Sequence, residues 1–83
     1  MDPDLIKYAE LVGFALYAAE LYAVVGDTSK ALDFLDRDVR AGDERAEWFA
    51  RDPLLASIRE EPRFLEILDS IRSRRAQRAA TKN

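Results

Sequence analysis

The side chains of this sequence that could do chemistry are carboxylates. Asp52 and the adjacent pair Glu60-Glu61 lie close together in the chain, as a general acid and base might. The chain has no histidine and no cysteine, which removes the commonest neutral-pH base, the commonest metal ligand and all thiol chemistry. Helix capping and helix-start charge explain these acids better, and 83 residues leave little room for a closed cleft. The sequence therefore predicts no enzyme, no cofactor and no metal site.

The basic side chains are concentrated at the C-terminal end. Residues 1–70 carry 16 acidic and 8 basic side chains, a net charge of −8, whereas residues 71–83 carry five basic and no acidic ones. The body would repel nucleic acid, and only this tail could attract RNA or an acidic surface. The tail has no interleaved aromatic residues, and positive charge at a helix C-terminus is favourable by itself. Nucleic-acid or acidic-surface binding through the tail is therefore the alternative function, not the main one.

Length and composition predict one small domain. The chain is 48% hydrophobic and 35% charged, which is typical of a folded globular protein. The apolar run Leu11–Ala19 ends at Glu20, which is too soon for a membrane span, and it lacks the flanks of a signal peptide. We predict a cytoplasmic protein with no membrane span, in which residues 1–72 form a single helical domain and residues 73–83 form a basic, partly frayed tail.

Helix start and stop signals predict an all-α fold. The organising stretch is Gly26-Asp27, where glycine ends one helix and aspartate caps the next, so that two helices form an antiparallel hairpin. Asp52-Pro53 and Glu61-Pro62 start later helices. Asp2 is expected to cap the first helix, with Pro3 at its first position, and the predicted helices are residues 3–25, 28–40, 44–51, 53–59 and one from 62 to about 78. The hairpin is thus expected to be followed by three shorter capping helices.

Aromatic residues are predicted to seal the end of this hairpin. Trp48 and Phe49 would anchor the helix over residues 44–51, which Asp43 would cap. Aromatic side chains beside leucines at helical spacing are more often core than a binding site, so we expect Trp48 to be buried. The last helix should present an apolar stripe of Phe64, Leu65, Leu68 and Ile71.

The hairpin resembles a tetratricopeptide repeat (TPR), a helical hairpin of about 34 residues. The matching run is Tyr22-(three residues)-Gly26-Asp27-(three residues)-Ala31-Leu32-(two residues)-Leu35, with Ala19 at a small position of the first helix. The segment from Trp48 through Asp52-Pro53 to Pro62-Arg63-Phe64 is similar to one that closes such arrays. Asp38 departs from the pattern, because the family usually has alanine there. The resemblance covers about Val12 to Ile71 and implies a terminal repeat with its closing segment, a scaffold with no catalytic residues.

In a TPR the first helix lines a concave groove that binds peptides. The residues that would face this groove are Gly13, Leu16, Tyr17, Glu20 and Val24. One subgroup of the family binds a peptide carboxylate with lysine, asparagine and arginine at such positions, and none of these residue types stands at the five groove positions here. The resemblance therefore implies an apolar or basic partner segment, with Leu16 and Tyr17 as contacts and Glu20 as the charge. The alternative is that Leu16, Tyr17 and Val24 are simply core.

The second half of the first helix, Leu11–Val25, is apolar nearly all round. A helix that is apolar all round is usually covered by protein on more than one side. We therefore predict a protein–protein interaction module whose partner-binding residues are Leu16, Tyr17, Glu20 and Val24. With no earlier repeat to cover it, this face should also let the protein associate into a homodimer.

Overall fold

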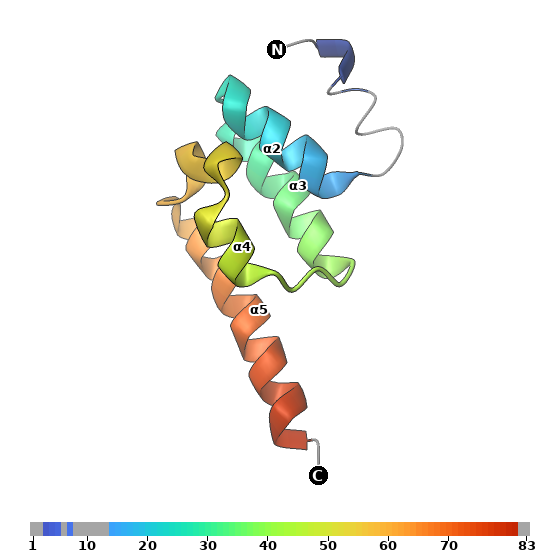
Figure 1. Ribbon diagram of the computed structural model, residues 1–83, viewed down its shortest axis with the longest axis vertical. Helices are drawn as coiled ribbons and strands as arrows, with labels where there is room; N and C mark the ends of the chain where they lie inside the picture. The colour runs from blue at the N-terminus through green and yellow to red at the C-terminus, as the bar shows by residue number, and fades with distance from the viewer. Residues whose placement is uncertain (1–2, 6, 8–13, 82–83) are drawn as a thin grey trace.

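The computed structural model describes residues 3–5, 7 and 14–81, and every regular element among them is helical, which confirms the predicted fold class (Figure 1). The elements are α2 (Ala15–Val25), α3 (Thr28–Arg40), α4 (Ala46–Arg51), the 3₁₀-helix η1 (Pro53–Ile58) and α5 (Pro62–Thr81). Figure 1 shows α2 and α3 side by side in the upper half, and α5 running down to the lower end of the molecule.

The α2–α3 hairpin turns at Gly26-Asp27, as predicted. Gly26 has a φ of +89°, in the left-handed region that glycine enters without a steric penalty. The Asp27 N–H donates to the Tyr22 carbonyl oxygen at 2.9 Å, and Asp27 Oδ1 accepts from the Lys30 N–H at 3.2 Å. The first bond ends α2 and the second caps α3, so two adjacent residues fix the turn.

Small residues bring the two helices together. Ala19 and Ala23 of α2 and Ala31 of α3 are fully buried in one core cluster. Their short side chains allow close contact between the helix backbones, and Leu35 and Val39 continue the buried face of α3. The side chain at Ala31 is therefore small for a packing reason.

The C-terminal elements pack over the end of this hairpin. Asp52 caps η1, because its Oδ1 accepts from the Leu54 N–H at 2.9 Å while Pro53 takes the first helical position. Ser57 of η1 donates its hydroxyl to the Ala23 carbonyl oxygen at 2.8 Å, which ties η1 to the last turn of α2. The fully buried large side chains of this part are Phe49, Leu55, Ile58, Phe64 and Ile71.

The predicted single helix over residues 3–25 is wrong at residue 14. Phe14 has φ −84° and ψ 71°, outside the helical region, and α2 begins after it at Ala15. Gly13, the weakest helix former of the run by about 1 kcal/mol, directly precedes this point in the sequence. Asp2, the expected cap, and residues 8–13, including Gly13 as a predicted groove residue, lie outside the described residues.

The three capping elements also differ from the prediction. α5 has 20 residues, more than α2 or α3, and remains helical to Thr81. α4 begins only at Ala46, and no side chain caps it. Asp43 instead accepts the Arg45 N–H at 3.2 Å, which closes a turn within the loop before α4. A carboxylate two residues from an amide forms such a turn without any helix.

The prediction that Trp48 is buried is wrong, because its side chain is 47% exposed. Ala46 and Phe49, three residues apart, take the buried side of α4 and are fully covered. Trp48 is the neighbour of Phe49 in the sequence, so its side chain points about 100° away from that of Phe49 around the helix axis. It therefore faces away from the core. On α5, Ile67 is buried and Leu65 is 54% exposed, so the apolar stripe follows the three- and four-residue helical spacing and omits Leu65.

Candidate functional site

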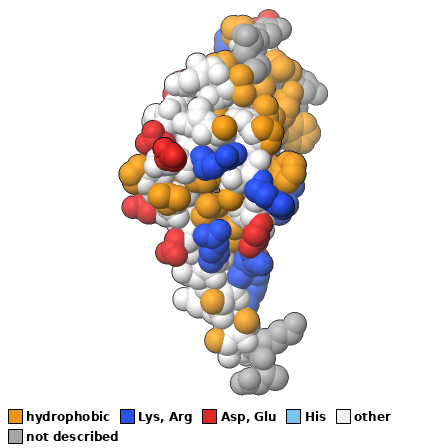
Figure 2. Space-filling model, turned by 60° about the vertical axis from the view of Figure 1, so that its left-hand side comes forward, with side chains coloured by type: hydrophobic (Ala, Val, Ile, Leu, Met, Phe, Trp, Pro, Cys, Tyr) orange, Lys and Arg blue, Asp and Glu red, His pale blue; other side chains and the backbone are white. Residues whose placement is uncertain are grey.

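The four predicted partner-binding residues lie on α2 with different degrees of burial. Tyr17 is 40% exposed and Val24 is 50% exposed, whereas Leu16 and Glu20 are partly buried and Leu16 packs against the core. Phe14, just before the helix, is 56% exposed. We call Phe14, Tyr17, Glu20 and Val24 the α2 face, because their three- and four-residue spacing places them on one side of the helix. Figure 2 shows a group of hydrophobic side chains on the upper right of the molecule, at the height of the hairpin.

A pocket of about 330 Å³ opens at the beginning of α2. Its lining residues are Phe14, Ala15, Leu16, Tyr17, Glu20 and Asp38. It thus brings together Leu16, Tyr17 and Glu20 of the predicted set, while Val24 lies further along the helix and outside it. Asp38 enters the pocket from α3, so the pocket has apolar and aromatic side chains together with two carboxyl groups.

The first of these carboxyl groups, Glu20, is hydrogen-bonded to Asp52, the cap of η1. Asp52 is 2% exposed, and its Oδ2 receives no hydrogen bond from an amide, hydroxyl or cation of the described residues. Glu20 can donate to this oxygen only while it carries a proton. Burial, followed by the hydrogen bond and the negative charge of Asp52, raises the pKa of Glu20 from 4.5 to about 8. Glu20 therefore retains its proton at neutral pH.

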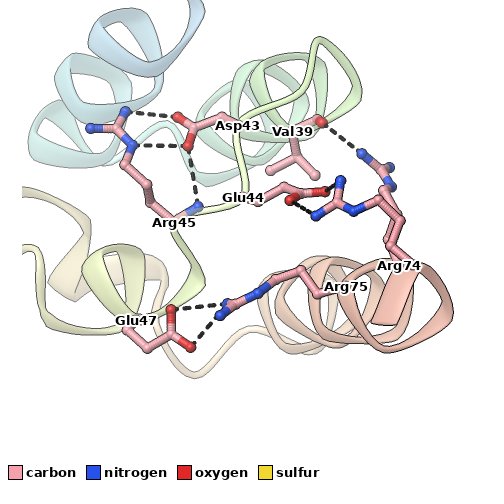
Figure 3. A network of polar contacts seen from close by, with 8 residues as sticks. Val39, Asp43, Glu44, Arg45, Glu47, Arg74 and Arg75 are labelled. Atoms are coloured by element: carbon pink, nitrogen blue, oxygen red, sulfur yellow. Dashed lines mark hydrogen bonds and ion pairs between the residues drawn. The ribbon is translucent and has the colours of Figure 1, made fainter. Parts of the chain in front are cut away.

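The second carboxyl group, Asp38, faces Asp43 in the loop after α3. Burial, and then the hydrogen bond with Asp43, raises the pKa of Asp38 from 3.8 to about 7. Asp43 itself is held by Arg45, whose Nε and Nη2 donate to Oδ1 and Oδ2 at 2.9 and 2.7 Å (Figure 3). These charge-assisted bonds lower the pKa of Asp43 to about 2.

Carboxyl groups from four separate segments therefore lie near one another, and three of them, Glu20, Asp38 and Asp43, act on the guanidinium group of Arg45. Glu20, Asp38, Asp43 and Asp52 come from α2, α3, the following loop and the start of η1, and Arg45 is the one cation that lowers the pKa of both Glu20 and Asp38. Sequence reasoning missed this cluster, because Asp43 and Asp52 were explained as caps. The one available signal was Asp38, which stands where the resembled family has alanine.

A second depression, of about 270 Å³, lies between α3 and α5. Its lining residues are Asp36, Arg40, Arg63, Glu66, Ile67 and Ser70. The Arg40 guanidinium pairs with Asp36 at 2.9 Å, and that of Arg63 pairs with Asp33 at 2.9 Å. Because its arginines are already neutralised, this depression is a weaker candidate than the pocket at α2.

The basic residues of α5 make contacts within the molecule (Figure 3). Arg74 Nη1 donates to the Val39 carbonyl oxygen at 3.3 Å, and Arg75 Nη1 donates to Glu47 Oε1 at 3.1 Å. Arg78 forms a two-bond ion pair with Glu44. These side chains fasten the second half of α5 to the loop before α4 and to α4 itself.

Comparisons with protein-family models, with curated proteins and with solved structures find no match to this chain. The TPR resemblance therefore stays a prediction from the sequence. Within the part of the chain that the structure describes, no group of three or more acidic side chains has the arrangement of a metal site. None of the described helices combines the length and apolar character required to cross a membrane.

Proposed function

We propose that this protein is a protein–protein interaction module that binds another protein chain through the α2 face. The observation that carries the proposal is the exposure of Phe14, Tyr17 and Val24 on one side of α2, at 56, 40 and 50%. Large apolar side chains grouped on one surface beside a pocket are typical of interaction sites. The TPR resemblance supports the same helix, since the first helix of that repeat lines the binding groove.

A random-peptide display library selected on the full chain tests this proposal without a known partner. Enriched peptides should bind the wild-type protein and lose at least about tenfold in affinity for the variant Tyr17→Lys, Val24→Lys, because lysine would put charge into an apolar contact. Leu65→Lys is the matched control, since Leu65 is equally exposed but lies on α5. Peptides that bind all three proteins equally, or no enriched peptides, would contradict the proposal.

Self-association is a second form of the same proposal, favoured by the same exposed apolar residues. A helix-on-helix homodimer through the α2 face would cover Tyr17 and Val24 in both copies. Sedimentation equilibrium of the wild-type chain should then give a dimer mass at high micromolar concentration and a monomer mass for Tyr17→Lys, Val24→Lys. A strict monomer of the wild type would refute self-association and leave a different protein as the partner.

The basic tail offers less support for the alternative of nucleic-acid binding. Arg74, Arg75 and Arg78 already donate to Val39 and to two glutamates of the same chain. Phosphate would have to displace these contacts before it could use the arginines. Salt-dependent binding to generic RNA that is lost on deleting residues 72–83 is the result this alternative requires.

A further inference from the structure

The pocket at the beginning of α2 has a carboxyl oxygen atom that lacks a donor. Asp38 lines the pocket, and its Oδ2 is a buried atom without a hydrogen-bond partner among the described residues. Glu20 lines the same pocket, and its own hydrogen bond goes to Asp52, a side chain that is 2% exposed. A buried acceptor without a donor is unfavourable, so the pocket is short of hydrogen-bond donors and of positive charge.

Arg45, the cation that acts on both Glu20 and Asp38, does not supply the missing donors. Both hydrogen bonds from the Arg45 side chain go to Asp43, in a two-bond arrangement that uses its guanidinium edge. The charge of Arg45 lowers the pKa values of Glu20 and Asp38, but burial and the neighbouring carboxyl groups raise these pKa values by more. One guanidinium therefore faces three carboxyl groups, and Glu20 and Asp38 have no cation of their own when they ionise.

The tail arginines do not fill the pocket either. Arg74, Arg75 and Arg78 are held at the other side of the loop, by Val39, Glu47 and Glu44. A second copy of this chain would bring the same acidic cluster to the same face, and like charges would meet across a two-fold interface. Charge complementarity thus favours a different protein as the source of the missing cation.

We propose that this pocket binds the arginine or lysine side chain of an apolar, basic segment of a partner protein, which rests on the function proposed above. The guanidinium or ammonium group would donate to Glu20 and Asp38 at the base of the pocket. Its aliphatic stem would lie against Leu16 and Tyr17, and the aromatic rings of Phe14 and Tyr17 suit a neighbouring cation. The volume of about 330 Å³ lies at the lower end of ligand pockets and suits one side chain.

Protonation of the pocket is linked to this binding. The groups that face Glu20 are Asp52, Arg45 and Asp38, and those that face Asp38 are Asp43 and Arg45. Because burial and neighbouring carboxyl groups raise the pKa of Glu20 to about 8 and that of Asp38 to about 7, both retain protons near neutrality. A bound cation favours their ionised forms, so binding releases protons and becomes tighter as the pH rises toward 9.

The probes are the capped peptide acetyl-Ala-Leu-Arg-Leu-Ala-amide and the same peptide with citrulline, which keeps the shape of arginine without its charge. Titration of the full ¹⁵N-labelled chain by NMR should give saturable shifts at the amides of α2 and Asp38. The citrulline peptide should bind at least about tenfold more weakly, because charge-assisted hydrogen bonds are lost. The arginine peptide should also bind the double variant Glu20→Gln, Asp38→Asn at least about tenfold more weakly than it binds the wild-type protein.

A control at an exposed carboxylate separates the pocket from general attraction to an acidic protein. Asp69→Asn removes one negative charge from an exposed position of α5 and should leave the affinity for the arginine peptide unchanged. Equal binding of the arginine and citrulline peptides, an equal effect of Asp69→Asn, or shifts confined to the α3–α5 depression would overturn the proposal. Absence of binding would overturn it too. If display selection still yields uncharged peptides that depend on Tyr17 and Val24, the interaction function stands without the cation pocket.

Discussion

The substitution Glu20→Gln should change how the stability of this protein depends on pH. In the folded chain the pKa of Glu20 is raised to about 8, chiefly by burial, from 4.5. The folded state therefore binds more protons than the unfolded state between these two pH values, and the free energy of unfolding falls as the pH rises through that range. The protonated form of Glu20 thus stabilises the folded state relative to the ionised form. This contribution to the free energy of unfolding is fully present below about pH 4.5 and is lost above about pH 8. Glutamine does not titrate, but its amide can still donate to Asp52.

The size of the effect follows from the shift in pKa. If the whole difference between 4.5 and about 8 counted, the loss would be about 5 kcal/mol at about 1.4 kcal/mol per pH unit. Glu20 is only partly buried, so water screens its charge and about 1 to 2 kcal/mol is a realistic figure. That is a large share of the stability of a domain of this size.

Urea denaturation followed by circular dichroism, repeated between about pH 5 and pH 9, measures this dependence. Glu20→Gln should match the wild type at the acidic end and be more stable by about 1 to 2 kcal/mol at the alkaline end. Glu66→Gln, at an exposed position of α5, is the matched control and should run parallel to the wild type. If the Glu20→Gln and wild-type profiles are also parallel, the pKa of Glu20 is not raised in the folded chain.

Two further predictions concern stability. Phe49→Ala should cost about 3 to 5 kcal/mol in urea denaturation, because Phe49 is fully buried, whereas Trp48→Ala should cost about 1 kcal/mol or less from its half-exposed position. Equal costs would mean that α4 is rotated relative to the core. Asp27→Ala should cost about 1 kcal/mol, since the Lys30 N–H loses its acceptor, and Asp27→Asn should restore most of it. If both Asp27 variants unfold like the wild type, the cap contributes nothing to the hairpin.

The sequence by itself determined the helical class and the positions of two chain turns. Gly26-Asp27 and Asp52-Pro53 could be interpreted correctly because a left-handed glycine, a capping carboxylate and a proline at the first helical position act within a few residues. Asp43 shows the limit of such signals. Its carboxylate does accept a backbone N–H, but in a turn before the helix and not at the helix end.

Only the tertiary structure decided which residues are covered. Trp48 and Phe49 are adjacent and both apolar, so periodicity on a six-residue helix could not choose between them, and packing buried Phe49. On α5, likewise, Leu65 and Ile67 are both apolar, but Leu65 is exposed and Ile67 is buried. In each case, which of the two residues is buried depends on where a neighbouring helix lies. The local sequence pattern does not contain this information.

The same holds for the candidate site. Tyr17 and Glu20 could be assigned to one side of a helix from their spacing, because helical geometry is local. The meeting of Glu20 with Asp38 and Asp52 could not be predicted, because it requires α3 and η1 to pack beside α2. Desolvation and charge act through space and not along the chain, so the raised pKa values and the donor-poor pocket exist only in the folded molecule.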